Sequence, residues 1–224
     1  MKTFIYSLIV FVCVGLGVLL YGNLQDTARK QKSQQQFEQR KASMLNDSPG
    51  SLRHSSPTWK QLTQQQQLRL KRVGFQPASL AGATSLEFKA EKLGGKTIQI
   101  STYQNHWLLL NFWATWCAPC RFEMPSLQQL HRSFEEEPFA VIGINLQEPE
   151  ESIKPFVRRT NLRFPIWMDK RGMIADYFFV TGVPETWLIA PGNRPVARLI
   201  GSRDWNDQQV LRVVESLLST NLSH

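Results

Sequence analysis

Two cysteines separated by two residues, Cys117 and Cys120, are the part of this sequence best suited to do chemistry. Thiols at this spacing can close a disulfide between themselves and open it again by thiol–disulfide exchange. A continuous apolar run at 107–113 precedes them and predicts a buried strand, and residues 122–134 show a helical pattern of apolar positions. The pair therefore lies at a strand-to-helix turn, where the N–H groups and the positive dipole end of the helix stabilise a thiolate on Cys117.

Other uses of paired cysteines fit this sequence less well. A structural zinc site needs four ligands, and the chain offers one further cysteine, Cys13, inside an apolar segment, while His131 adds one ligand at most. A permanent disulfide across two intervening residues closes too small a loop to restrict the unfolded chain much. The glycines at 15 and 17 lie in an apolar run and form no dinucleotide-binding loop. We therefore expect a redox-active dithiol with no bound metal and no organic cofactor.

The pattern from Ser85 onward predicts an α/β domain with a central sheet flanked by helices. A hairpin of short strands is expected around Gly94 and Gly95, and Ser152 is expected to cap a helix that carries Pro155 in its first turn. The expected strands after the hairpin span 107–113, 139–146, 164–168, 185–190 and 195–201, and the expected helices span 122–137, 152–160, 173–180 and 205–218.

The N-terminal part of the chain predicts a membrane anchor and a tether. Residues 4–22 form an apolar run without a charge, which is long enough to cross a bilayer as a helix. A cleaved signal peptide is the alternative, although residues 20–22 offer only one small side chain at the cleavage positions. The sequence thus divides into a signal anchor at 1–22, a basic Gln-rich linker at 23–76 with a hint of a helix in its last third, and a folded domain at 77–224.

The formal net charge of +8 is concentrated in the linker. Residues 23–76 hold ten Lys and Arg against three Asp and Glu, whereas residues 77–224 hold fifteen of each. A basic excess beside a membrane segment is explained by anionic lipid or by solvation, so we expect no nucleic-acid partner. Taken alone, the positive-inside rule applied to Arg29, Lys30 and Lys32 keeps the following segment in the cytoplasm.

Two segments resemble the membrane-anchored thioredoxins of the TlpA/ResA/DsbE (CcmG)-like family. They are residues 111–125, NFWATWCAPCRFEMP, and residues 182–189, GVPETWLI. The resemblance covers roughly 85–218 and implies a thioredoxin fold with an N-terminal β-hairpin extension, held in the bacterial periplasm, which opposes the positive-inside argument. It also implies that Pro184 is cis and faces the dithiol, and a kink there leaves the backbone of Val183 free to pair with an extended substrate beside Cys117.

Glu123 lies three residues after Cys120, so it faces the same way as that thiol on one helical turn. A carboxylate there is placed to accept a proton from Cys120, and the resemblance implies a glutamate near the active site. The alternative is an exposed acid that favours the helix dipole. Soluble thioredoxins place a buried aspartate where Asn111 stands, so this chain relies on Glu123 or on water.

These residues predict a protein-disulfide oxidoreductase. Cys117 attacks a substrate disulfide and Cys120 resolves the mixed disulfide, while Trp116 offers an apolar contact surface and Trp113 is expected in the core. The resemblance implies that a membrane thiol reductase of the DsbD/CcdA type supplies electrons and that apocytochrome c is the leading substrate. A Cu(I) metallochaperone that uses the two thiolates and a non-catalytic docking module are the alternatives.

Overall fold

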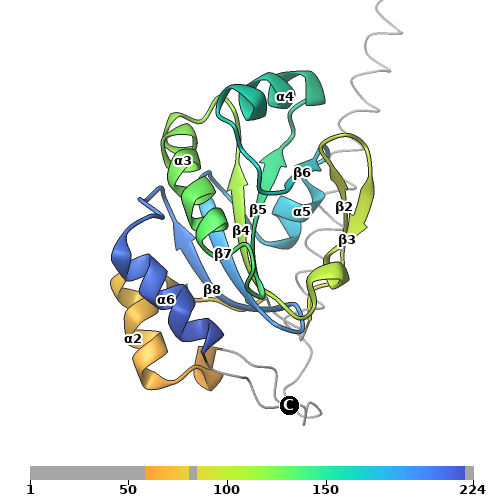
Figure 1. The fold of residues 1–224 in the computed structure, drawn as a ribbon. Helices are drawn as coiled ribbons and strands as arrows, with labels where there is room; N and C mark the ends of the chain where they lie inside the picture. The colour runs from red at the N-terminus through yellow and green to blue at the C-terminus, as the bar shows by residue number, and fades with distance from the viewer. Residues whose placement is uncertain (1–58, 81–84, 220–224) are drawn as a thin grey trace, which may run out of the picture. The chain divides into compact units, whose positions relative to one another are not determined.

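The computed structural model describes residues 59–80 and 85–219 (Figure 1). The predicted membrane span at 4–22 and the first part of the predicted linker lie outside these ranges. None of the helices within them is long and apolar enough to cross a membrane.

A mixed sheet forms the centre of this part of the chain, in the strand order β1-β8-β7-β4-β5-β6-β2-β3. The middle strands β4, β5 and β6 run parallel to one another, whereas β7 runs antiparallel to β4. The predicted hairpin around Gly94 and Gly95 is confirmed as β2 and β3, and β2 joins the sheet through β6. The strands are β1 (Gln76–Pro77), β2 (Lys89–Lys92), β3 (Thr97–Gln99), β4 (Trp107–Trp113), β5 (Phe139–Leu146), β6 (Ile166–Asp169), β7 (Glu185–Ala190) and β8 (Arg194–Ile200).

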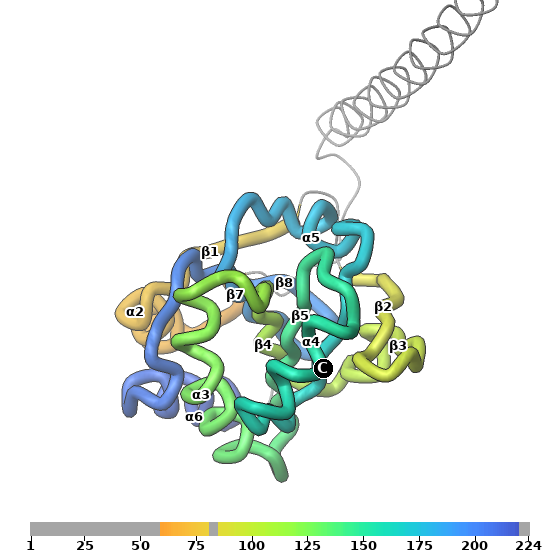
Figure 2. Tube along the Cα trace, turned by 90° about the horizontal axis from the view of Figure 1, so that it is seen from above, coloured from red at the N-terminus to blue at the C-terminus, as the bar shows by residue number. Residues whose placement is uncertain are grey.

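Helices cover both faces of the sheet. Figure 2 shows α3 and α6 on one side of the strands and α5 on the other. The alternation of β4 builds a core on each side, because Leu109 and Trp113 join the apolar cluster that contains α3 and α6, whereas Leu110 and Phe112 join the cluster that contains α5. The helices are η1 (Trp59–Gln61), α2 (Gln64–Arg72), η2 (Ile100–Tyr103), α3 (Ala118–Ser133), α4 (Glu150–Arg159), α5 (Met173–Tyr177) and α6 (Gln208–Leu218).

Residues 59–77 belong to the folded domain, although the sequence analysis assigned them to the linker as far as residue 76. Helix α2 begins with a capping box between Thr63 and Gln66, and Leu70 is fully buried in the core shared with α6. Gln66 interrupts the apolar stripe by which an amphipathic helix is recognised in a sequence. Its side-chain amide is nevertheless buried and donates a hydrogen bond to the carbonyl of Ser216 at 2.7 Å. A buried polar residue that is hydrogen-bonded therefore stands where the pattern requires an apolar one.

Helix α4 begins at Glu150, two residues before the predicted start, and its cap is Pro149 rather than Ser152. Glu150 and Glu151 occupy the first turn, where carboxylates favour the positive end of the helix dipole. Pro155 consequently lies inside the helix instead of in its first turn.

The packing of α2 predicts that Leu70→Ala lowers the free energy of unfolding by about 2–5 kcal/mol, because it empties a fully buried site. Leu68→Ala is the matched control, since Leu68 lies on the same helix with 51% of its side chain exposed, and we expect it to change stability by less than about 0.5 kcal/mol. Urea denaturation followed by tryptophan fluorescence compares the two variants. Equal midpoints would mean that α2 is not part of the cooperative unit.

Candidate active site

The two cysteines lie where β4 ends and α3 begins. Cys117 is the N-cap of α3, and its Sγ accepts a hydrogen bond from the backbone N–H of Cys120 at 3.2 Å. A disulfide joins the two side chains. Cys117 keeps 5% of its surface exposed and Cys120 keeps none, so an incoming disulfide reaches Cys117 first. An N-cap sulfur that receives a backbone N–H is favoured as the anion when the disulfide is reduced.

The segment before β7 faces this sulfur. The Val183–Pro184 peptide bond is cis, and the carbonyl oxygen of Val183 lies 3.6 Å from the Sγ of Cys117. Within residues 59–80 and 85–219, the backbone N–H and C=O of Val183 pair with no other backbone group. Pro184 is buried and leads directly into β7, which pairs with β4. The structure thus brings Val183 and Pro184 to the dithiol.

Glu123 lies on α3, three residues after Cys120, and is buried with 1% of its surface exposed, so the alternative of an exposed first-turn acid is wrong. Its Oε1 accepts a hydrogen bond from the Nδ2 of Asn111 at 2.8 Å. Its Oε2 accepts from the backbone N–H of Arg203 at 3.2 Å and from the Nε1 of Trp205 at 2.9 Å. Every one of these contacts is a donor to the carboxylate, which is the arrangement that an ionised side chain needs.

Two opposing effects set the acidity of Glu123. Burial raises the pKa of its carboxyl group above the usual value, while the hydrogen bonds from Trp205, Asn111 and Arg203 and the positive charge of Arg203 act in the opposite direction. Desolvation is the larger effect, so this acid holds its proton more readily than an exposed glutamate. The Oδ1 of Asn111 is buried with no hydrogen-bond partner in the described part of the chain, so it is an open acceptor on the side chain that donates to Glu123.

A second buried carboxylate, which the sequence analysis missed, holds the turn that carries the cysteines. Glu148 lies between β5 and α4 and accepts hydrogen bonds from the backbone N–H of Thr115 at 2.7 Å, from the Thr115 hydroxyl and from the Nδ2 of Asn145 at 2.7 Å. It thereby ties the end of β4 to the end of β5. The available signal was topological, since the carboxyl ends of neighbouring parallel strands meet at one edge of a sheet.

The aromatic residues around the motif divide between surface and core. Trp116 is 69% exposed and Phe122 is 80% exposed, and both lie within five residues of a reactive cysteine. Trp113 is fully buried, as predicted. The exposed pair offers an apolar contact area beside Cys117 and Cys120, to which the sequence analysis assigned Trp116 but not Phe122.

Glu185 follows the cis proline but faces the other side of the sheet. Its Oε1 accepts a hydrogen bond from the Nε1 of Trp187 at 2.8 Å and lies 3.9 Å from Arg198. Burial raises the pKa of this carboxyl group, while Trp187 and Arg198 act against that effect. Side chains alternate along β7, and Trp187 belongs to the core on the α5 side, so Glu185 is not part of the cluster around Glu123.

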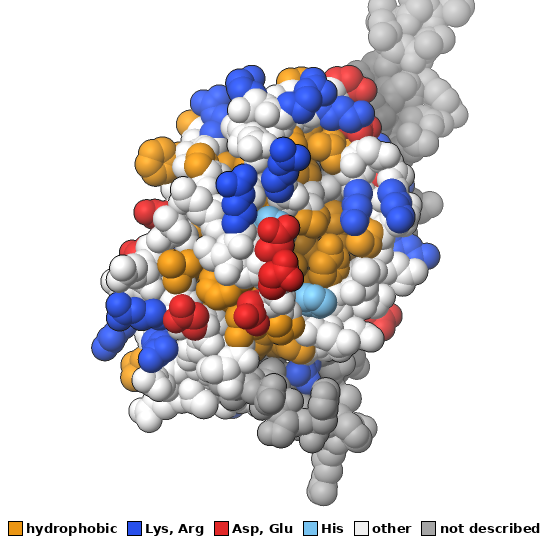
Figure 3. All heavy atoms as spheres, viewed as in Figure 1, with side chains coloured by type: hydrophobic (Ala, Val, Ile, Leu, Met, Phe, Trp, Pro, Cys, Tyr) orange, Lys and Arg blue, Asp and Glu red, His pale blue; other side chains and the backbone are white. Residues whose placement is uncertain are grey.

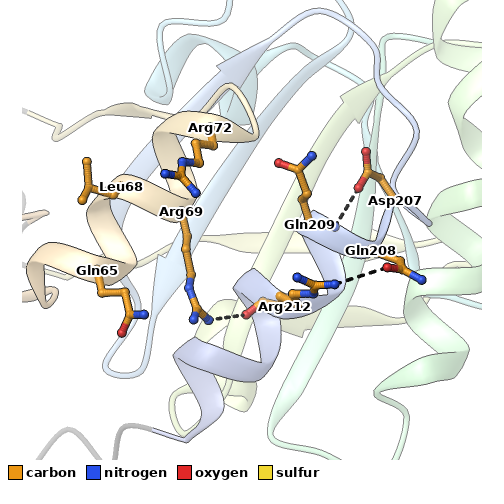
Figure 4. Close-up of a pocket in the computed structure, with 8 residues that line it drawn as sticks. All are labelled: Gln65, Leu68, Arg69, Arg72, Asp207, Gln208, Gln209 and Arg212. Atoms are coloured by element: carbon orange, nitrogen blue, oxygen red, sulfur yellow. Dashed lines mark hydrogen bonds between the residues drawn. The ribbon is translucent and has the colours of Figure 1, made fainter.

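A hollow of about 800 Å³ between α2 and α6 is separate from the dithiol (Figure 4). Arg69, Arg72 and Arg212 line it together with Asp207, and Arg69 donates to the carbonyl of Arg212 at 3.4 Å. Figure 3 shows basic side chains gathered over α2 and α6 on this face of the molecule. None of the six site residues predicted from the sequence lines this hollow.

Comparison with known proteins agrees with this geometry. Residues 81–194, just over half of the chain, match the AhpC/TSA family. The chain belongs to this family. Its relatives include the thiol-disulfide oxidoreductase ResA of Bacillus cereus, which is 32% identical over 122 residues that cover 54% of this chain and 70% of the relative. ResA of Halalkalibacterium halodurans is 36% identical over 109 residues, which cover 49% of this chain and 62% of the relative.

Solved structures share the fold. A secreted thiol-disulfide isomerase from Corynebacterium glutamicum superposes with a TM-score of 0.55 at 27% identity, over 61% of this chain and 86% of that structure. A putative thiol:disulfide interchange protein DsbE from Chlorobium tepidum also gives a TM-score of 0.55 at 22% identity, over 60% of this chain and 94% of that structure, which indicates the fold alone. The resemblance to the thioredoxin-like proteins of the ResA and DsbE kind is confirmed, and this member is a thiol-disulfide oxidoreductase with a thioredoxin-like fold.

The raised pKa of Glu123 predicts an unusual pH dependence of stability. The folded state holds its proton at pH values where the unfolded chain, with a carboxyl pKa near 4.5, has lost it, so the free energy of unfolding falls as pH rises from about 4.5 through the folded-state pKa. Glu123→Gln is expected to remove this decline, while Glu185→Gln, the control, removes only the separate contribution of its own raised pKa. Urea titrations between pH 4 and pH 8 measure the slopes. An unchanged slope in Glu123→Gln would contradict the assignment.

The role of Glu148 predicts that Glu148→Gln destabilises the protein by about 1–3 kcal/mol, because an amide cannot accept all the hydrogen bonds that the carboxylate receives. Glu151→Gln is the control, since Glu151 is exposed in the first turn of α4 nearby. Thermal unfolding gives the stability. Exchange of the Thr115 amide proton, which we expect to accelerate only in Glu148→Gln, reports on the turn, and unchanged exchange there counts against this role.

Proposed function

We propose that the protein is a membrane-tethered reductant of protein disulfides, with its dithiol outside the cytoplasm. The observation that carries this proposal is the buried carboxyl group of Glu123, held by N–H donors one helical turn from Cys120. Reduction of a substrate is completed only when Cys120 attacks the mixed disulfide, and a buried thiol needs a proton acceptor for that attack. Glu123 supplies one on the inner side of the motif.

The cycle follows from these positions. The Cys117 thiolate attacks a substrate disulfide, so a Cys117–substrate bond forms and the second substrate sulfur leaves as a thiolate. Cys120 gives its proton to Glu123 and attacks the Sγ of Cys117, which breaks the mixed disulfide and releases the other substrate sulfur. The substrate gains two electrons and the enzyme is left with the Cys117–Cys120 disulfide. The proton on Glu123 is then available for the released thiolate.

The surface beside Cys117 supports an extended polypeptide as the substrate. The backbone of Val183, which pairs with no other backbone group of the described residues, offers strand-like hydrogen bonds. Pro184 holds this segment against the sulfur, and Trp116 provides an apolar contact for neighbouring substrate side chains. Apocytochrome c, with paired haem-attachment cysteines, is the substrate we propose. A membrane thiol reductase of the DsbD/CcdA type is the proposed source of electrons, and the apolar segment at 4–22 is the proposed anchor in the bacterial inner membrane.

Trapping in cells tests this proposal. Cys120→Ala removes the thiol that resolves the mixed disulfide on Cys117. We therefore expect this variant to accumulate mixed disulfides that mass spectrometry identifies, with apocytochrome c among the trapped proteins. Cys117→Ala is the control and should trap none. A Cys117→Ala protein that still supports cytochrome c assembly would identify a docking module instead of an oxidoreductase.

The reduction potential of the pair decides the direction of electron flow. We expect a value near that of thioredoxin, roughly −270 mV, measured by equilibration of the full chain with a glutathione or dithiothreitol buffer. A potential near about −120 mV, as in DsbA, would make the protein an oxidant and would reject the proposal.

A further inference from the structure

The loop between β8 and α6 supplies two of the three donors that hold Glu123. They are the backbone N–H of Arg203 and the indole N–H of Trp205. The same loop is attached to α3 a second time, because the backbone N–H of Trp205 donates to the Oγ of Ser126 at 3.0 Å and that hydroxyl donates to the carbonyl of Glu123 at 2.8 Å. The position of this loop therefore determines how many hydrogen bonds the buried carboxylate receives.

Residues 59–77 hold this loop from its outer side. The guanidinium of Arg203 donates to the carbonyl of Val73 at the end of α2, and it also lies 5.7 Å from the ring of Trp205. The ring of Phe75 meets the ring of Trp205 edge-on at a centroid distance of 6.2 Å. Phe75 and Trp205 are both buried, with 3% and 0% of their surfaces exposed. Trp205 is thus fixed between Phe75 and Glu123.

Residues 59–77 are themselves bound to the domain on both sides of Val73 and Phe75. Gln66 donates to the carbonyl of Ser216 in α6, and Gln76 pairs with Arg198 in β8. Between these attachments Gly74 has a φ of 92°, and a Cβ there would lie 3.3 Å from the Cδ1 of Leu199, so the chain turns tightly against β8. These attachments restrict the movement of the loop between β8 and α6 as long as residues 59–77 remain packed against it.

We propose that residues 59–77 are a positioning element of the active site, in which Val73 and Phe75 hold Arg203 and Trp205 against Glu123. Neither this segment nor the 201–205 loop lies within the 81–194 match to the family. The element acts through the donors, since Val73 accepts a hydrogen bond from Arg203 and Phe75 contacts the ring of Trp205. Its consequence for catalysis rests on the proposed function, whereas its effect on Glu123 does not.

The charges around Glu123 make Phe75 the informative position. Asn111 from β4 and the loop groups contact the carboxylate directly, and Arg203 is the nearby cation, with Asp204 and Asp207 acting on it in turn. Replacing Arg203 would change this charge as well as the geometry. Phe75 carries no charge and packs against the ring of Trp205, so its replacement acts on the electrostatics around Glu123 by moving a donor.

The test is the titration of Glu123 in the oxidised full chain, followed by carbon NMR of labelled glutamate carboxyl groups and assigned with Glu123→Gln. Phe75→Leu should shift the midpoint of Glu123 to higher pH, making it a roughly tenfold weaker acid, because a charged acceptor loses hydrogen bonds. Phe88→Leu is the matched control, since Phe88 packs on Trp167 and Phe178 in the core on the other side of the sheet, and it should leave the midpoint in place. An identical midpoint in all three proteins overturns the proposal, as does an equal shift in both variants.

Hydrogen exchange in the unaltered protein tests the same coupling without a substitution that disturbs folding. If the segment positions the loop, the Arg203 amide and the Trp205 indole protons exchange no more slowly than the amide protons of α2. Protection of these two protons that outlasts the opening of α2 by tenfold or more refutes the positioning role. Both measurements use the oxidised protein without a substrate or an electron donor, so they stand or fall independently of the reductant activity.

Discussion

A buried carboxyl group is the constraint on which the arrangement of this active site depends. An ionised side chain in an apolar interior costs several kcal/mol unless hydrogen bonds replace its water. Glu123 receives them from Asn111 in the sheet and from Arg203 and Trp205 in the loop before α6. Strand β4, helix α3 and this loop must therefore keep fixed relative positions, because displacement of any one of them removes hydrogen bonds from the buried carboxylate.

The two sulfur atoms lie in different environments, one at the N-cap of α3 and the other in the core. Cys117 caps α3, where the N–H of Cys120 and the helix dipole favour the thiolate without any base. Cys120 is fully buried, so its sulfur is out of reach of solvent. In the proposed cycle, Glu123, whose pKa is raised by burial, is the group that accepts the proton of this second thiol. The first turn of α3 thus holds both Cys117, the attacking sulfur of the proposed cycle, and Cys120, the resolving one.

The sequence predicted what depends on periodicity and on the chemistry of the motif. The central strands and the buried Trp113 follow from runs of apolar residues, which report burial directly, and the hairpin follows from the short segments around Gly94 and Gly95. The sequence did not reveal the role of Glu148 or the packing of α2 against the folded domain. Glu148 contacts Thr115, which is 33 residues away in the chain, and Gln66 looks like a break in the pattern until its partner 150 residues away is known. Polar residues that are buried because they are paired leave no periodic signal, because their partners are distant in sequence.

The boundary between tether and domain is accordingly set by packing and hydrogen bonds with distant residues, which the composition of the segment does not reveal. Residues 59–76 read as a continuation of a Gln-rich linker, yet Val73 and Phe75 contact the loop that completes the site around Glu123. A domain that began at residue 77 would retain both thiols, Pro184 and strands β2 to β8, but it would lose Gln76 of β1 and the residues that pack against that loop. The dithiol motif can therefore be recognised from a few residues, whereas the acidity of the group behind it is a property of segments at opposite ends of the described chain.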